Sequence, residues 1–129
     1  MGARLEQEIG LLRSRWAELR YDPGGRWVLL PAYPLPAGWN RSTTDVVFQI
    51  QMNHPGAAPY GFYTPTGLLH QGHSLNNYQD PAPTQPPFGG RWGIFSWSPE
   101  DWQPQADIRA GSNLFTWAHS FSQRFIQGA

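Results

Sequence analysis

Residues 46–52 alternate in polarity, and this alternation constrains the fold of the 129-residue chain more than any other feature. A repeat of two residues is typical of a β-strand that turns one face to a hydrophobic core. The residues of that face are Val46, Phe48, Ile50 and Met52. The sequence therefore predicts a strand here, with one face in the core.

Stretches with helical spacing lie on both sides of this strand. At residues 3–19, and again from residue 112 onward, apolar residues recur at steps of three and four. Such steps place apolar side chains in one stripe along an α-helix. The stripe residues are Leu5, Ile9, Leu12, Trp16 and Leu19 in the first stretch, and Leu114, Trp117, Phe121 and Phe125 in the second. We expect an amphipathic helix at each end.

A turn signal follows the first helical stretch. Residues 22–25, Asp-Pro-Gly-Gly, combine a fixed φ with residues that tolerate positive φ. They predict a hairpin between strands at 19–21 and 26–30. The three prolines within residues 31–40 remove amide donors from a ladder, so this segment is expected to be an extended surface connection.

A second break separates the next two strands. Residues 54–59 contain two prolines and a glycine, and the aromatic residues 60–63 are expected to form a fourth strand. Residues 64–90 show no period, and a connection this long in a compact domain is usually functional or mobile. The sequence thus predicts one α+β domain over residues 1–129: helix, four-stranded antiparallel meander, long loop, helix.

The balance of charge limits the classes of partner. Nine basic and nine acidic side chains give a formal net charge of zero. A neutral chain has no field that steers it toward nucleic acid or an anionic membrane surface. No apolar run approaches the roughly 20 residues of a transmembrane helix, and the polar start is unlike a secretory signal. We expect a cytoplasmic protein that binds another protein, with neither nucleic acid nor membrane as its partner.

Two residue types are missing from the chain. There is no cysteine, and all nine basic residues are arginine, so lysine is absent too. These absences exclude disulfides, thiolate metal ligands, and thiol or side-chain amine nucleophiles. Four scattered histidines make a poor metal site, and no glycine-rich loop leads from a strand into a helix. We expect neither a metal nor an organic cofactor.

A resemblance to a known family rests mainly on residues 27–63. These include the phrase WVLLPAYPLPAGW at 27–39, the strand at 45–52, the His-Pro…Pro break at 54–59, and YGFY at 60–63. This block, with the order of elements, resembles the prokaryotic ubiquitin-conjugating-like family E, a bacterial branch of the ubiquitin-conjugating superfamily. The resemblance implies a UBC-like fold with a long active-site loop. It also implies a conjugation pathway with a ubiquitin-like protein and an activating enzyme as partners, and antiphage defence is conceivable from this kinship.

The resemblance also implies where an active site would lie. The superfamily's nucleophile is a cysteine that follows a short apolar strand. In this chain that place is held by Ser96, with Ser98 two residues later, so the carried protein would form an oxyester instead of a thioester. A serine hydroxyl needs a neighbouring base, usually histidine, and we expect His73 or, second, His70 from the long loop to act as that base.

Further site residues follow from the same comparison. The superfamily uses an asparagine to stabilise charge on the reacting carbonyl oxygen, within a His-Pro-Asn motif that this chain lacks. Asn77, or its neighbour Asn76, is expected to fold back into that role. Asp80 is a candidate for orienting a base or for deprotonating the incoming nucleophile.

Plainer interpretations stand beside these. Ser96 as a turn residue, Ser98 as a helix cap before Pro99, and His54 as a turn histidine need no catalytic role. Three functional hypotheses therefore remain. The chain is an oxyester-forming conjugating enzyme, a non-catalytic adaptor that binds a ubiquitin-like protein or the activating enzyme, or a chain in which Ser96 or Ser98 replaces a native cysteine.

Overall fold

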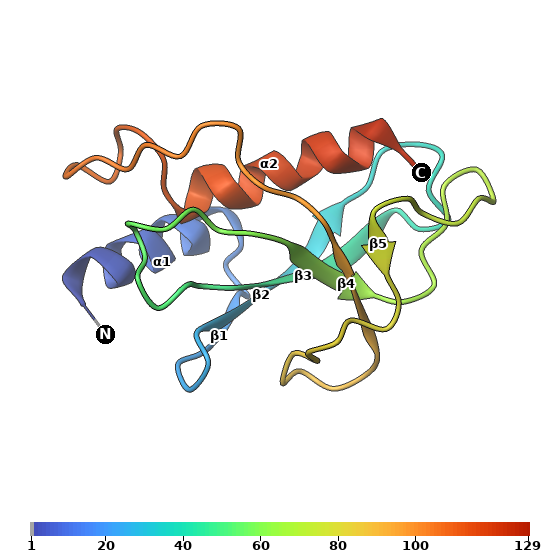
Figure 1. The fold of residues 1–129 in the computed structure, drawn as a ribbon, viewed down its shortest axis with the longest axis horizontal. Helices are drawn as coiled ribbons and strands as arrows, with labels where there is room; N and C mark the ends of the chain where they lie inside the picture. The colour runs from blue at the N-terminus through green and yellow to red at the C-terminus, as the bar shows by residue number, and fades with distance from the viewer. Residues whose placement is uncertain (1) are drawn as a thin grey trace.

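A six-stranded antiparallel sheet and two helices form the α+β fold of residues 2–129, the part of the chain that the computed structural model describes (Figure 1). In chain order the elements are α1 (Ala3–Arg15), β1 (Arg20–Asp22), β2 (Trp27–Pro34), β3 (Thr43–Gln49), β4 (Phe62–Pro65), β5 (Tyr78–Gln79), β6 (Trp92–Phe95) and α2 (Leu114–Gln127). Across the sheet the strands follow the order β1-β2-β3-β4-β6-β5. Neither helix of residues 2–129 is long and apolar enough to cross a membrane.

The prediction of four strands was wrong, because two more strands extend the sheet. The four predicted strands are present as β1 to β4, each antiparallel to its neighbour. The apolar run at residues 92–97 contributes β6, which pairs with β4. Only two residues, Tyr78 and Gln79, make up β5, which pairs with β6. Two residues are too few to show a period, so residues 64–90 gave no strand signal.

The surface connection predicted at residues 31–40 is partly strand. β2 continues to Pro34, and its register with β3 shifts between Leu30 and Tyr33. At this irregularity Ala32 adopts a φ of 54°, in the left-handed region. A bulge accommodates a proline that has no amide to donate. Pro31 therefore lies within this strand at the irregularity, and the strand ends at Pro34.

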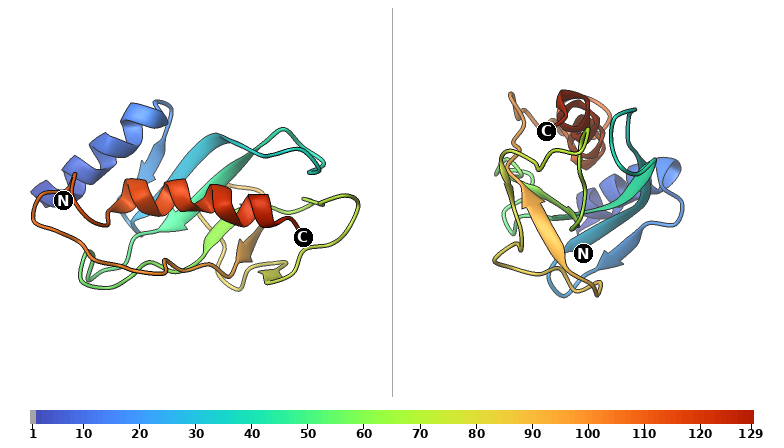
Figure 2. Two further views of the ribbon diagram at one scale, coloured as in Figure 1. Left: turned by 90° about the horizontal axis from the view of Figure 1, so that it is seen from above. Right: turned by 90° about the vertical axis from the view of Figure 1, so that its right-hand side faces the viewer.

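Both faces of the central strands are covered, which the alternating pattern did not predict. On one face α2 lies across the sheet, and the Phe62 and Phe121 rings stack with centroids 4.2 Å apart (Figures 1 and 2). On the other face Val47 is as fully buried as Phe48. Its cluster there contains Trp27, Leu29, Tyr63, Ala82 and Trp92. Met52 was wrongly assigned to the core, since it lies beyond β3 and is 81% exposed.

The short strand β5 is fixed by one aromatic ring. Tyr78 covers Gly93 so closely that a Cβ at residue 93 would lie 2.2 Å from the tyrosine Oη. The same ring lies 4.6 Å from the Phe95 ring, between centroids, and its hydroxyl is 3.3 Å from the hydroxyl of Thr64. Burial raises the pKa of Tyr78, so this hydroxyl is protonated at neutral pH. Side-chain packing, more than a long ladder, therefore holds β5 to the sheet.

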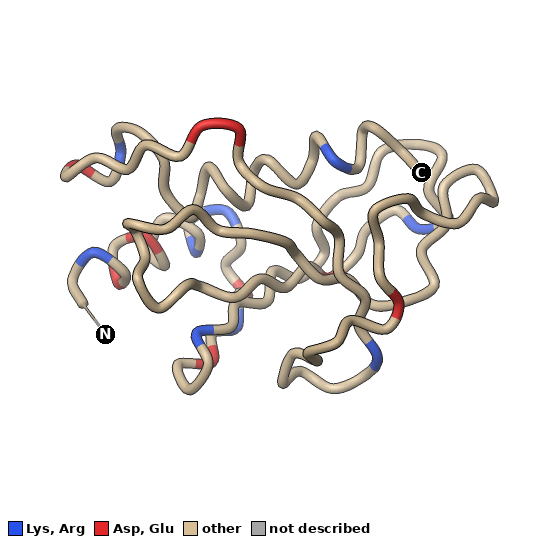
Figure 3. The backbone as a smooth tube through the Cα atoms, in the orientation of Figure 1, with Lys and Arg blue, Asp and Glu red and all other residues tan. Residues whose placement is uncertain are grey.

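Charged residues are spread along the chain (Figure 3), but one carboxylate is fully buried. Glu8 Oε2 accepts a hydrogen bond from Arg4 Nε at 2.9 Å and lies 2.8 Å from His54 Nε2. Its Oε1 accepts from the backbone amide of Leu114 at 2.6 Å. His54 lies in a turn as predicted, and its ring also links that turn to α1. The carboxylate joins α1, this turn and the start of α2.

Candidate functional site

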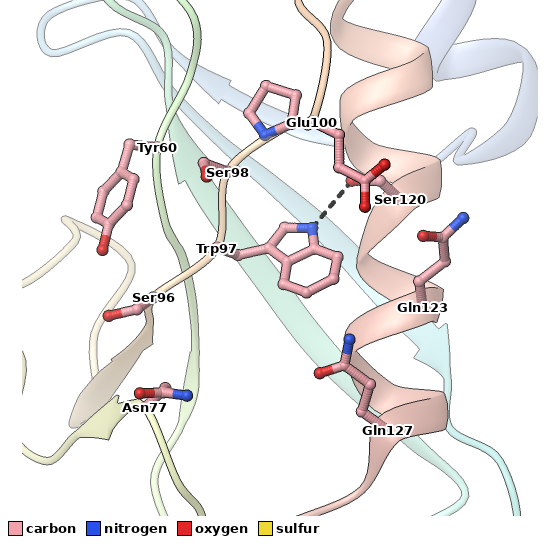
Figure 4. Close-up of a pocket in the computed structure, with 10 residues that line it drawn as sticks. Tyr60, Asn77, Ser96, Trp97, Ser98, Glu100, Ser120, Gln123 and Gln127 are labelled. Carbon is pink, nitrogen blue, oxygen red and sulfur yellow. Dashed lines mark hydrogen bonds between the residues drawn. The ribbon is translucent and has the colours of Figure 1, made fainter.

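A pocket of about 450 Å³ lies between the chain segment that follows β6 and one face of α2 (Figure 4). The segment after β6 contributes residues 96–100, and α2 contributes three side chains along one face. Two further residues come from other loops. The lining residues are Tyr60, Asn77, Ser96, Trp97, Ser98, Pro99, Glu100, Ser120, Gln123 and Gln127. We call this the Ser96 pocket.

Three of the site residues expected from the sequence, Ser96, Ser98 and Asn77, line this pocket. Ser96 is the first residue after β6, and its backbone amide donates to the Asn77 carbonyl at 2.8 Å. Asn77 has a φ of 53°, a left-handed conformation that asparagine tolerates better than most residues. All three side chains are exposed. The long loop thus places Asn77 beside the serine, while Asn76 does not line the pocket, and a role for Asn77 in stabilising charge stays a prediction.

The two histidines expected to act as a base do not line the pocket. His70 and His73 pair with each other in a small antiparallel bridge, through backbone bonds of 3.2 and 2.9 Å. The His70 ring packs edge-on against Trp39, with centroids 5.3 Å apart. It lies so close to Gly128 that a Cβ there would be 2.7 Å from the ring. The histidine is therefore used to pack the loop against the end of α2.

Asp80 also lies outside the lining of the pocket. Its Oδ1 accepts from Arg91 Nε at 3.1 Å, and the two side chains are 41% and 63% exposed. An exposed ion pair of this kind contributes little to stability and leaves both groups solvated. The structure gives Asp80 a surface partner and no contact with the pocket.

Sequence reasoning missed the helical side of the pocket. Ser120, Gln123 and Gln127 follow one another at steps of three and four, so they form a polar stripe along α2. That spacing was visible in the sequence beside the apolar stripe. Trp97 Nε1 donates to Ser120 Oγ at 3.1 Å and ties the segment after β6 to the helix (Figure 4).

Glu100 and Tyr60 complete the set that the sequence did not indicate. Glu100 is the only carboxylate among the ten lining residues, and no histidine is among them. Tyr60 is 59% exposed and presents a flat aromatic surface at the rim. Within residues 2–129 no three side chains of the metal-binding types converge on one point.

The pocket therefore has a definite chemical character. Its side chains are mainly hydroxyls and primary amides, which donate and accept hydrogen bonds at neutral pH without changing charge. A serine without a neighbouring base stays a protonated, weak nucleophile. Such a lining suits recognition of polar groups more directly than proton transfer. In comparisons with known proteins, no family model, no curated protein and no solved structure matches the chain.

Proposed function

We propose that this protein is a UBC-like binding module that holds the C-terminal tail of a ubiquitin-like protein in the Ser96 pocket without forming a covalent bond to it. One observation carries the proposal: the pocket is lined mainly by amide and hydroxyl side chains and by no histidine. The activating enzyme of the same pathway is the second expected partner. A cytoplasmic location belongs to this proposal.

The kind of ligand follows from hydrogen-bonding capacity. Each residue of an extended tail offers one N–H donor and one C=O acceptor. The primary amides of Asn77, Gln123 and Gln127 each carry both functions, so they can pair with either group. The indole of Trp97 and the ring of Tyr60 provide flat surfaces for the apolar parts of the tail. A tail with small side chains would bring its backbone closest to these groups.

The UBC-like fold is part of the proposal and is supported by the order of elements. The chain runs helix, antiparallel strands, long loop, helix, and the Ser96 pocket follows β6. This is the region where the sequence resemblance expects the active site of the superfamily. The two additional strands, β5 and β6, are the departure from the expected four-stranded meander.

An oxyester carrier is the second candidate, favoured by the exposed Ser96 hydroxyl beside Asn77. In that reaction Ser96 Oγ would form an ester bond to the terminal carbonyl carbon of the ubiquitin-like protein. The carbon–sulfur bond to the activating enzyme would break, and the serine proton would pass to the departing thiolate. Glu100 is the only carboxylate in the lining that would be available to assist this transfer.

One experiment separates the two candidates. The protein is mixed with its cognate ubiquitin-like protein, activating enzyme and ATP, and intact mass is recorded alongside binding by calorimetry. The module predicts binding without an adduct, weakened by Gln123→Ala and unchanged by Gln7→Ala, a matched control on α1 outside the pocket. An adduct that survives reducing agent, is cleaved by hydroxylamine and is lost in Ser96→Ala would establish the carrier instead.

Two further results complete the test. Absence of both an adduct and binding would refute both candidates. A Ser96→Cys variant addresses the hypothesis that serine replaces a native cysteine. If this variant gains an adduct that reducing agent removes, the pocket supports thioester chemistry once a thiol is supplied.

A further inference from the structure

A buried arginine lies under one edge of the Ser96 pocket. Arg124, in the last turn of α2, is 4% exposed. None of the ion pairs within residues 2–129 includes it. A buried cation without a carboxylate is costly unless other groups satisfy it, and burial lowers the pKa of Arg124. The contacts that satisfy this guanidinium therefore indicate which segments of the chain it holds together.

Three groups surround the guanidinium. Nη1 donates to the carbonyl of Gly128, just beyond the end of α2. Nη2 donates to the carbonyl of Asn76 at 2.8 Å, 48 residues away in the sequence. The flat face of the group lies 4.8 Å from the centroid of the Phe95 ring. One side chain thus joins the helix end, the long loop and β6.

These contacts are adjacent to the pocket residues. Asn76 directly precedes Asn77, and Phe95 directly precedes Ser96. Ser96 in turn donates its backbone amide to the Asn77 carbonyl at 2.8 Å. Arg124 therefore contacts Asn76 and Phe95, the residues that precede the two pocket residues. The Ser96–Asn77 hydrogen bond joins those two pocket residues to each other.

We propose that Arg124 is a positioning residue that fixes the Asn77–Ser96 edge of the pocket in the geometry that receives a ligand. The proposal rests on the proposed function, since it assigns Arg124 a role in the binding site described there. Only arginine suits the place, because its planar fork reaches two carbonyls in different directions while its face stacks on a ring. Lysine keeps the charge and loses the fork.

The first test needs no ligand. Amide hydrogen exchange is measured by NMR for the wild type, Arg124→Lys and Arg124→Met. We expect the Ser96 amide to exchange about tenfold faster in both variants relative to the amides of β3, the effect of losing about one charge-assisted hydrogen bond. The control is Tyr33→Phe, which removes a buried 2.7 Å hydrogen bond to the Ala118 carbonyl on the same helix. It should leave the ratio of the two exchange rates unchanged.

A measurement on the wild type keeps the test decisive if a variant does not fold. The Nη–H protons of Arg124 should give separate, slowly exchanging signals with cross-peaks to Asn76 and Phe95. A single averaged signal would overturn the proposal. An unchanged Ser96 exchange ratio in a folded Arg124→Lys would overturn it equally.

The ligand arm separates this proposal from the proposed function. With a peptide of the last ten or so residues of the cognate ubiquitin-like protein as probe, Arg124→Lys should weaken binding about tenfold, and Gln7→Ala should not. If the wild type binds no peptide but Ser96 exchange still depends on Arg124, the proposed function fails and the positioning role stands. If the peptide binds Arg124→Lys as tightly as the wild type, the positioning role fails.

Discussion

The two ends of α2 are each anchored by one buried charged residue, and the two charges are opposite in sign. At the start, the Glu8 carboxylate accepts from the Leu114 amide at 2.6 Å. At the end, the Arg124 guanidinium donates to backbone carbonyls. A helix carries partial positive charge at its N-terminus and partial negative charge at its C-terminus. Each of the two residues therefore has a charge opposite in sign to the helix end that it contacts, which is the stabilising arrangement.

The anchors differ in how their charge is compensated. Glu8 contacts Arg4 and His54, and this cluster does not line the Ser96 pocket. Arg124 has carbonyls and an aromatic ring for partners, and it lies next to the pocket residues. A closed ion-pair cluster serves stability, whereas a cation held by carbonyls from separate segments sets where those segments lie. We expect mutations at the first end to change stability and mutations at the second to change the site.

The largest expected effect is at Glu8. In Glu8→Ala the partners His54 and Arg4 lose their shared acceptor, and the Leu114 amide loses a buried bond. Removing one member of a buried ionic cluster costs about 3 kcal/mol of unfolding free energy. Urea unfolding at pH 7 checks the value. An unchanged unfolding free energy in Glu8→Ala would contradict the difference proposed between the two helix ends. Loss of ligand binding by the folded fraction of this variant would contradict it equally.

Acid should affect the same end of the helix. Burial raises the pKa of Glu8, but the bonds from His54 and Leu114 outweigh it, so the pKa lies below the ordinary 4.5. A lowered folded pKa means that the stabilising contribution is complete above the unfolded value and is lost as pH falls through the folded value. Between pH 5 and 3 the urea midpoint should fall more steeply for the wild type than for Glu8→Gln. Parallel pH curves would contradict this.

A smaller effect is expected from the N-cap of α2. Asn113 Oδ1 accepts from the Thr116 amide at 2.8 Å, and Thr116 Oγ1 accepts from the Asn113 amide at 2.9 Å. Asn113→Ala should lower the unfolding free energy by about 1–2 kcal/mol. Thermal unfolding measures it, with Ser122→Ala, a half-buried residue further along the same helix, as control. Peptide affinity should not change, and a loss of affinity would mean that both helix ends set the pocket.

The smallest expected effect is at Asp80. Its partner Arg91 is exposed, so Asp80→Asn should change the unfolding free energy by less than about 0.5 kcal/mol. Neither binding nor Ser96 exchange should respond. A change in ligand affinity would restore the site role that the sequence suggested for this carboxylate and would extend the functional region beyond the Ser96 pocket.

The sequence predicted the parts of the fold that repeat over many residues. Both helices were found because their apolar stripes extend over several turns, although α1 ends at Arg15, earlier than expected, with Trp16 as its cap. The two-residue β5 depends on contacts made by the loops, and so does the burial of Val47 on the second face of the sheet. Contacts between distant segments leave no local period, so these features were not predictable from spacing.

The site was predictable in part for the same reason. Ser96 was indicated by the resemblance, and the structure places Asn77 beside it, while the charge-stabilising role suggested for Asn77 stays a prediction. The expectation that His73 or, second, His70 acts as a base did not anticipate that the two residues pair with each other outside the pocket and that the His70 ring packs against Trp39. Arg124 looked like one more polar residue on an amphipathic helix, because nothing in the sequence marks which arginine will be buried.

The close fit of Tyr78 over Gly93 has an evolutionary consequence. Any side chain at position 93 would displace the ring, and with it the strand that begins next to Asn77. Selection that preserves the pocket would therefore also preserve Gly93, although this residue does not line the pocket. In diverging descendants of this sequence, the aromatic residue and the glycine should be retained together or lost together, so their covariation would identify lineages that keep the pocket.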